Sequence, residues 1–204
     1  LLVRVPGVRA CLVDTGPNPW AARRVVRVLS RRGVRGPVDL LLTHPHGDHV
    51  GGWATLTRLW PVETVRGPVL PEAESHWAPF RPERGGPSLE AVRRDDTWAL
   101  GEARLRVHWP PKPLRLSEAN ATALVCSIRW RAWEAWFMGD VGGIQERDLL
   151  DLGDPPLFVG HRLLKPGHHG GRGVCDPTWI AALKPEVALI TAGRANAFGF
   201  PAAE

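Results

Sequence analysis

The chain has 204 residues, of which 44% are hydrophobic and 23% charged, and it carries a net charge of +5. This composition excludes a disordered chain, and no apolar run reaches the roughly 18 to 20 residues that a membrane helix needs. The three cysteines are far apart and form no C-x-x-C pair, so we expect three separate thiols and neither a disulfide scaffold nor a cysteine-rich zinc site.

Arginine supplies nearly all of the positive charge, because the chain contains only three lysines. Guanidinium groups match the geometry of phosphate, so the excess favours a polyanionic partner. The same arginine-rich, tyrosine-free composition is also typical of a high-GC genome, and charge alone leaves both interpretations open.

The pattern of apolar residues predicts alternating strands and helices. In the first half we expect a hairpin over 1–13, a helix over 20–32, a strand over 38–42, a helix over 53–60 and a strand over 62–65. In the second half we expect strands over 104–109, 121–130, 133–138, 162–165 and 187–191, and helices over 145–152 and 178–183. This order favours a layered α/β sandwich.

The segment 67–96 is rich in proline, glycine and charge, and we expect an irregular insertion there with one short helix near 89–94. Leu1 directly begins a strand pattern, so we expect the chain to be a piece of a longer protein.

A cluster of four potential metal ligands follows the predicted strand over 38–42: His44, His46, Asp48 and His49. In an extended loop the side chains two residues apart point the same way, so His44 and His46 can face one metal ion. Asp48 and His49 follow a turn and can address a neighbouring position. Imidazole and carboxylate ligands suit zinc and tolerate manganese or iron. The alternative is a polar loop with surface histidines.

The histidine cluster resembles the H-x-H-x-D-H signature of the metallo-β-lactamase fold. Residues 12–16, Leu-Val-Asp-Thr-Gly, resemble the strand and turn that precede that signature, and residues 137–140, Phe-Met-Gly-Asp, resemble the strand end that supplies a bridging carboxylate. The resemblance implies a single domain over residues 1–204 with a four-layer αββα sandwich. It also implies two divalent metal ions, Mn²⁺ or Zn²⁺, and no small organic cofactor.

Within that superfamily the chain resembles the C-terminal domain of the ComEC family of competence DNA-uptake channels. The resemblance rests on Asp48-His49-Val50-Gly51-Gly52, on the segment 120–125 and on Leu163-Leu164-Lys165-Pro166-Gly167-His168-His169-Gly170. Three positions depart from the family pattern: His46 stands where the family often has Asp, Gly171 replaces a serine, and Phe200 replaces a histidine.

The resemblance assigns roles to the candidate ligands. His44 and His46 would bind the first metal ion, Asp48 and His49 the second, and Asp140 would bridge them. Two adjacent side chains in an extended loop diverge, so only one of His168 and His169 would complete the ligand set. His169 is slightly favoured as that ligand. The other histidine, His168, would then contact the scissile phosphate.

Further polar residues are candidates for a supporting role. Asn120 and Thr122 lie at a predicted strand start and would bind substrate or orient a ligand, although an asparagine that caps a turn is the alternative. Asp14 would fix the histidine loop through hydrogen bonds, or simply form a turn. Of the remaining histidines we interpret His76 as a surface residue and His108 as structural, which leaves the first metal position short of one ligand.

These expectations together predict a nuclease. Two divalent ions lower the pKa of a bridging water to about 7 and hold phosphate oxygens in line, and Asp48 can orient or deprotonate that water. The expected reaction is hydrolysis of single-stranded DNA during natural transformation. We expect a soluble domain of an integral membrane protein, working beside the rest of its channel, with the membrane face left open. The alternatives are another hydrolase of this fold, acting on phosphodiesters, lactones or lactams, and a non-catalytic DNA-binding module with a degraded metal site.

Overall fold

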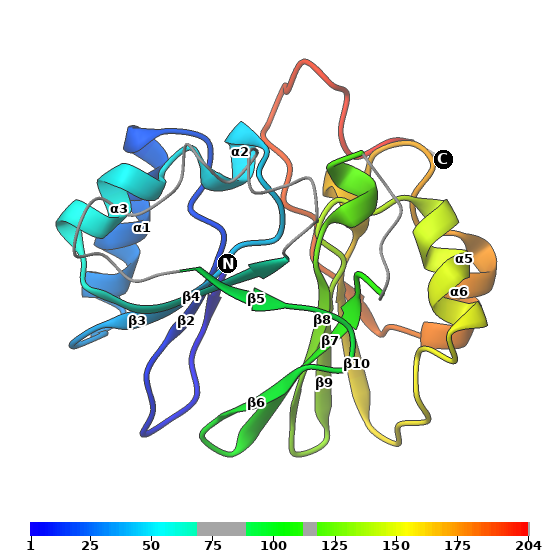
Figure 1. The fold of residues 1–204 in the computed structure, drawn as a ribbon. Coiled ribbons are helices and arrows are strands. Elements are labelled where there is room, and N and C mark those ends of the chain that lie inside the picture. The colour runs from blue at the N-terminus through cyan, green and yellow to red at the C-terminus, as the bar shows by residue number, and fades with distance from the viewer. Residues whose placement is uncertain (69–88, 112–117, 204) are drawn as a thin grey trace. The chain divides into compact units, whose positions relative to one another are not determined.

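The computed structural model describes residues 1–68, 89–111 and 118–203. The chain forms two compact units, residues 1–92 and residues 93–204, which are described separately. Each unit contains one mixed β-sheet with helices packed beside it (Figure 1). The α/β class expected from the sequence is therefore confirmed.

The sheet of the first unit has five strands in the order β1-β2-β3-β4-β5. These are β1 (Leu2–Val3), β2 (Cys11–Val13), β3 (Val38–Leu41), β4 (Val62–Pro68) and β5 (Leu89–Val92). The pair β1 and β2 is antiparallel and all other neighbours are parallel. The side chains of β2 and nearly all of those of β3 are buried, which is typical of parallel strands covered on both faces.

Three helices complete the first unit: α1 (Pro19–Arg31), α2 (Gly47–Val50) and α3 (Trp53–Leu59). Helix α1 begins at Asn18, whose Oδ1 accepts the backbone N–H groups of Trp20 and Ala21 at 3.0 Å each. Its Ala22 and Leu29 are buried, and α1 packs against α3 on one face of the sheet (Figure 1).

The second sheet has six strands in the order β11-β10-β9-β8-β7-β6. These are β6 (Thr97–Leu100), β7 (Ala103–Trp109), β8 (Val125–Trp130), β9 (Trp133–Phe137), β10 (His161–Lys165) and β11 (Val187–Ala188). Strands β6 to β9 form an antiparallel meander, whereas β9, β10 and β11 are parallel. The carboxyl ends of β9 and β10 therefore lie side by side, and chain segments with candidate ligands follow both ends.

Helices α5 (Gly143–Asp151) and α6 (Pro177–Leu183) pack against each other in the second unit (Figure 1). Trp136 of β9 and Trp179 of α6 are fully buried, with ring centroids 5.4 Å apart in an edge-to-face arrangement. Leu149 and Leu183 extend the same core. Two short 3₁₀ segments, η2 (Asn120–Thr122) and η3 (Gly167–Gly170), precede and follow strands of this sheet.

The structure corrects two of the expected elements and adds a strand that was not expected. Residues 89–92 form strand β5 and not a helix, because pairing with β4 satisfies their backbone groups. Residues 97–100 form the unexpected strand β6, and the strand expected over 121–130 begins only at Val125, after the 3₁₀ turn η2. The expected insertion is largely outside the described residues, as is His76.

The three cysteines, Cys11, Cys126 and Cys175, are free thiols, as the sequence predicts. Among the residues that the structure describes, no helix has both the length and the apolar character needed to cross a bilayer.

Candidate metal centre

The histidine loop of the first unit gathers three imidazole rings. It follows β3 and leads into α2, and His44 and His49 are buried whereas His46 and Asp48 are exposed. The ring centroid of His44 lies 4.7 Å from that of His46 and 4.1 Å from that of His49. The fold thus brings the three histidines of the sequence motif into one cluster.

Asp14, directly after β2, holds this loop in place. Its Oδ1 accepts the backbone N–H of Thr43 at 2.8 Å, and its Oδ2 lies 3.0 Å from the Thr43 hydroxyl and 2.7 Å from His49 Nδ1. Burial acts to raise the pKa of Asp14, but the hydrogen bonds from His49 and Thr43 outweigh burial and hold this pKa below its ordinary value. The Asp14 carboxylate is therefore charged, as the supporting role expected from the sequence requires.

The contact with Asp14 also determines which nitrogen of His49 can bind a metal. Nδ1 donates to the carboxylate, so Nε2 is the acceptor nitrogen of the ring, and it lies 3.5 Å from Asp48 Oδ2. Histidines that bind metals commonly donate their other ring N–H to a carboxylate in this way. The donor set of imidazole and carboxylate groups fits a divalent transition metal ion.

Two glycines permit the close packing of the loop. A β-carbon on Gly51 would lie 2.2 Å from the carbonyl oxygen of Pro17, and one on Gly52 would lie 2.6 Å from that of Thr15. The Thr15 hydroxyl in turn donates to the His49 carbonyl at 3.1 Å. The segment after β2 therefore packs directly on α2, which any larger residue at 51 or 52 would prevent.

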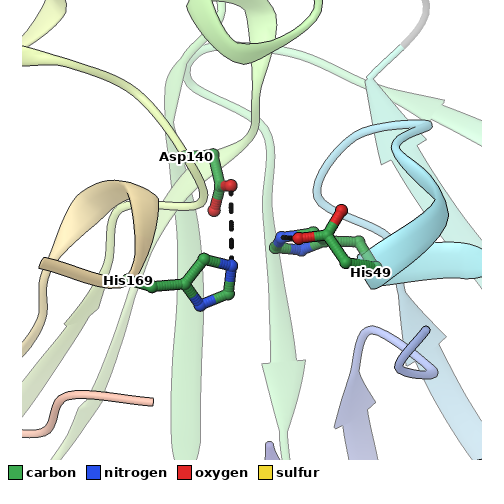
Figure 2. A group of neighbouring side chains, drawn as sticks. His49, Asp140 and His169 are labelled. Atoms are coloured by element: carbon green, nitrogen blue, oxygen red, sulfur yellow. Dashed lines mark ion pairs between the residues drawn. The ribbon is translucent and has the colours of Figure 1, made fainter. Parts of the chain in front are cut away.

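In the second unit, Asp140 and His169 form a carboxylate–imidazole pair. Asp140 follows β9 and His169 follows β10, and Asp140 Oδ2 lies 3.7 Å from His169 Nε2 (Figure 2). His169 Nδ1 lies 2.9 Å from the Thr191 carbonyl oxygen, which can only accept, so Nδ1 donates this hydrogen bond and Nε2 is the nitrogen that faces Asp140. Lys165 Nζ donates to the Gly139 carbonyl at 2.8 Å and lies 3.7 Å from Asp140 Oδ1.

The backbone of the two adjacent histidines is unusual. His168 has φ 39° and His169 has φ 55°, so both non-glycine residues occupy the left-handed region. Such conformations cost on the order of 1–3 kcal/mol each and persist where the surroundings fix them. The ring of Phe200 packs against both rings, with centroids 5.2 Å from His168 and 6.1 Å from His169. A β-carbon on Gly167 would lie only 2.1 Å from the Val141 carbonyl oxygen, so the loop crosses that backbone closely.

A pocket of about 790 Å³ in the second unit adjoins these groups. Asn120, Asp140, His168 and Arg147 are among its lining residues, so the structure brings three of the predicted site residues to one cavity. Asn120 Oδ1 is buried and has no hydrogen-bond partner among the residues that the structure describes. Thr122 is buried and its hydroxyl donates to the Ala119 carbonyl at 2.8 Å, so its predicted contact with substrate stays a prediction.

Three supporting residues are absent from the sequence prediction. The Thr43 hydroxyl lies within hydrogen-bond distance of Asp14 and of His44 Nδ1. In the second unit, Lys165 contacts Asp140 and the Thr191 carbonyl oxygen contacts His169. Thr43 directly precedes the histidine motif, and its position was the available signal. Nothing in the local sequence indicates that Thr191, 22 residues away, accepts a hydrogen bond from His169.

Comparisons with known proteins place this arrangement in a family context. The chain is 26% identical over 209 residues to ComE operon protein 3 of Bacillus subtilis, a match that covers 93% of this chain and 26% of that protein. It is 27% identical over 202 residues to competence protein ComA of Neisseria gonorrhoeae, covering 98% of this chain and 26% of that protein. The chain thus spans about a quarter of the length of these relatives.

The fold is also found among solved structures. The Rm3 metallo-beta-lactamase matches with a TM-score of 0.56 at 18% identity, covering 90% of this chain and 83% of that chain. The model of the metallo-beta-lactamase superfamily matches residues 1–194. The fold and the family expected from the sequence are thereby confirmed, and the chain belongs to the metallo-beta-lactamase superfamily.

Proposed function

We propose that this chain is a metal-dependent phosphodiesterase that hydrolyses single-stranded DNA during DNA uptake. The observation that carries the proposal is that each unit presents a carboxylate–imidazole pair with donor atoms close together, 3.5 Å apart for Asp48 and His49 and 3.7 Å apart for Asp140 and His169. Membership of a superfamily of hydrolases and the similarity to competence proteins support the choice of chemistry and substrate.

In this proposal the donor groups of both units hold two divalent ions, Mn²⁺ or Zn²⁺. His44, His46, Asp48 and His49 would supply the ligands of the first unit, and Asp140 and His169 those of the second. The orientation of His169, with Nδ1 held by Thr191 and Nε2 facing Asp140, supports His169 over His168 as the ligand. Bound ions of this kind activate water and stabilise the charge that develops on phosphate oxygens.

The chain's own residues would carry the remaining steps. Asp48 is exposed and can accept the proton of the attacking water. His168 lines the 790 Å³ pocket and can contact the scissile phosphate, while the Asn120 side chain in the same pocket can hold the substrate. All three roles are consistent with the placement of these side chains within their own units.

Basic residues of the first unit suit a nucleic-acid backbone. Helix α1 carries four exposed arginines and no acidic residue: Arg23, Arg24, Arg27 and Arg31. Exposed guanidinium groups bind phosphates without regard to sequence, and such binding weakens steeply with salt. Cleavage of DNA without strong sequence preference, and with strong salt dependence, follows from this surface.

The names of the relatives supply the biological context of the proposal. Competence protein ComA and ComE operon protein 3 are about four times as long as the aligned region. By analogy, this chain would be the hydrolytic domain of a larger membrane protein, with the rest of the channel as its partner and the non-imported strand as its substrate.

The test is cleavage of an end-labelled single strand by metal-stripped chain reloaded with Mn²⁺ or Zn²⁺. We expect cleavage only with metal, and a loss of about 10²-fold or more in the Asp48→Asn variant. Asp151→Asn is the matched control, because Asp151 is an exposed carboxylate at the end of α5 and is not one of the proposed ligands. It should cleave like the unmodified chain.

The opposite results identify the alternatives. Cleavage that Asp48→Asn retains would contradict the assignment of the histidine loop. Metal binding without cleavage of DNA would favour another substrate of this fold, such as a lactone or a lactam. DNA binding without metal binding would favour a non-catalytic module.

A further inference from the structure

A hydrogen-bonded series of three polar side chains, Ser127, His108 and Asp154, lies in the second unit, outside the candidate metal centre. His108 of β7 is fully buried, its Nδ1 lies 2.8 Å from Asp154 Oδ1, and its Nε2 lies 2.9 Å from Ser127 Oγ. Arg94 Nη1 contacts the other oxygen of Asp154 at 2.5 Å. The indole of Trp136 stacks on the imidazole with a centroid distance of 4.1 Å, so the ring is held on its face as well as at both nitrogens.

The charges fix the direction of these hydrogen bonds. Burial acts to raise the pKa of Asp154, but the hydrogen bonds from His108 and Arg94 hold it below its ordinary value, so Asp154 is ionised. Burial lowers the pKa of His108 in spite of the carboxylate, so the imidazole is neutral near pH 7. An ionised Asp154 can only accept, which places the single imidazole proton on Nδ1 and makes Nε2 the acceptor of the Ser127 hydroxyl proton.

Ser127, at one end of this hydrogen-bonded series, lines a cavity. A pocket of about 330 Å³ includes Ser127 and His108 among its lining residues. Three arginines and two acidic residues also line this pocket: Arg104, Arg106, Arg129, Asp95 and Glu134. Arg106 pairs with Asp95 at 2.9 Å and Arg129 with Glu134 at 2.7 Å, whereas Arg104 is exposed and makes no ion pair within the described part of the chain.

We propose that Ser127, His108 and Asp154 form a second, metal-independent hydrolytic site, which acts on small carboxylic esters that carry a negatively charged group. The hydroxyl, the imidazole and the carboxylate stand in the order nucleophile, base and orienting group that this chemistry needs. Arg106 and Arg129 are paired with acidic residues of the pocket, so Arg104 is the group that favours an anionic substrate and stabilises the negative charge that develops on the carbonyl oxygen.

The reaction balances without a cofactor. Ser127 Oγ attacks the carbonyl carbon while its proton moves to His108 Nε2, and the C–O bond to the alcohol breaks as that proton passes to the departing oxygen. Water then attacks the acyl-serine with His108 as base, which releases the carboxylic acid and restores the serine. Asp154 is a positioning residue, because it contacts the imidazole and not the ester.

Covalent labelling tests the nucleophile directly. The intact chain is treated with a fluorophosphonate in the presence of EDTA, and the labelled peptide is located by mass spectrometry. We expect one adduct, on Ser127, which Ser127→Ala abolishes and the control Ser30→Ala, in helix α1, retains. Absence of an adduct on Ser127 in the folded, unmodified chain would overturn the proposal, and this outcome does not depend on how any variant folds.

Turnover tests the substrate class. With EDTA present, the chain should hydrolyse 4-acetoxybenzoate faster than phenyl acetate, and Ser127→Ala should lose at least about 10²-fold in rate. Arg104→Gln should reduce the preference for the anionic ester by roughly tenfold. Hydrolysis that persists in Ser127→Ala would contradict the proposal. Because no metal is present, these results stand apart from those of the DNA cleavage assay.

The role of Asp154 has a spectroscopic signature. The proton between His108 Nδ1 and Asp154 should give a downfield proton resonance that Ser127→Ala retains and Asp154→Asn loses. Asp154→Asn should also slow labelling of Ser127, because an amide can hold the ring in the wrong tautomer. Unchanged labelling in a folded Asp154→Asn variant would contradict the positioning role.

Discussion

A β-carbon on Gly171 would lie 2.7 Å from Cε1 of Phe200, so the aromatic ring occupies the space that a side chain at position 171 would need. The family that the sequence resembles has a serine at position 171 and a histidine at position 200. The two departures from that pattern therefore lie in contact in this chain, where the ring at 200 fits beside a residue without a side chain at 171. The ring also packs on His168 and His169 and so supports their backbone.

This relationship predicts a coupling between the two sites. Gly171→Ala should lower the free energy of unfolding by about 1 kcal/mol, because the backbone at 171 is extended and the clash with the ring is the main cost. In a Phe200→Ala background the same substitution should cost less. The measurement is a double-mutant cycle from denaturant unfolding. Equal costs in both backgrounds would show that Phe200 does not fill the space at 171.

Two glycines, Gly47 at the start of helix α2 and Gly51 directly after its end, should differ in how much stability an alanine substitution costs. Gly51→Ala places a carbon 2.2 Å from the backbone oxygen of Pro17, which cannot rotate away as a flexible side chain can, and we expect a loss of about 3 kcal/mol or more in the free energy of unfolding. Gly47→Ala meets no atom within 4 Å and should be neutral or stabilise by up to about 1 kcal/mol. Thermal or denaturant unfolding of both variants checks the prediction. Similar losses in both would contradict the close contact between residue 51 and the backbone of Pro17.

Asp14 should control metal affinity without being a ligand. Its carboxylate orients His49 and Thr43, so Asp14→Asn should weaken metal binding by about 10- to 100-fold. The affinity is measured by competition with a chromophoric chelator. Asp39→Asn is the matched control, since Asp39 is a carboxylate in the same unit that pairs with Arg9 at 3.1 Å and touches no proposed ligand. Equal affinities for the unmodified chain and Asp14→Asn would contradict the role.

Glu134 makes the free energy of unfolding depend on pH in the acid range. Burial acts to raise its pKa, but hydrogen bonds that include those from Arg129 and Arg162 lower it from the ordinary value of 4.5. A carboxyl whose pKa is lowered by folding stabilises the folded chain fully above pH 4.5, and this stabilisation disappears as the pH falls through the lowered pKa. The difference in unfolding free energy between the unmodified chain and Glu134→Gln should therefore shrink below pH 4.5. A constant difference between pH 7 and pH 3 would contradict this account.

The sequence predicted most of the strands and helices, and it failed where long-range contacts decide. The motif from His44 to His49 follows a buried strand, and its local spacing is enough to indicate the imidazole cluster. The helix expected at 89–94 is wrong because pairing of Leu89–Val92 with β4 overrides local preference. The hydrogen bond from His169 to Thr191 joins residues 22 apart, and no local pattern reports it.

The hydrogen-bonded series of Ser127, His108 and Asp154 also depends on contacts between residues far apart in the sequence, which local patterns do not reveal. The three residues lie on two strands and a loop, 19 and 46 positions apart along the chain. Each residue taken alone is unremarkable in the sequence, and a histidine inside a strand is reasonably interpreted as structural. Only the register that places His108 and Ser127 on neighbouring strands, with a shift between Val107 and Trp109, brings the groups together.

The measurement that tests the central claim most directly is the rate of metal-dependent cleavage of single-stranded DNA by Asp48→Asn and by Asp140→Asn, each compared with the unmodified chain and with Asp151→Asn. If the carboxylate of each unit is a metal ligand, both ligand variants should lose nearly all activity, whereas Asp151→Asn should retain it. Full activity in Asp48→Asn or in Asp140→Asn would contradict the proposal that the donor groups of both units take part in cleavage.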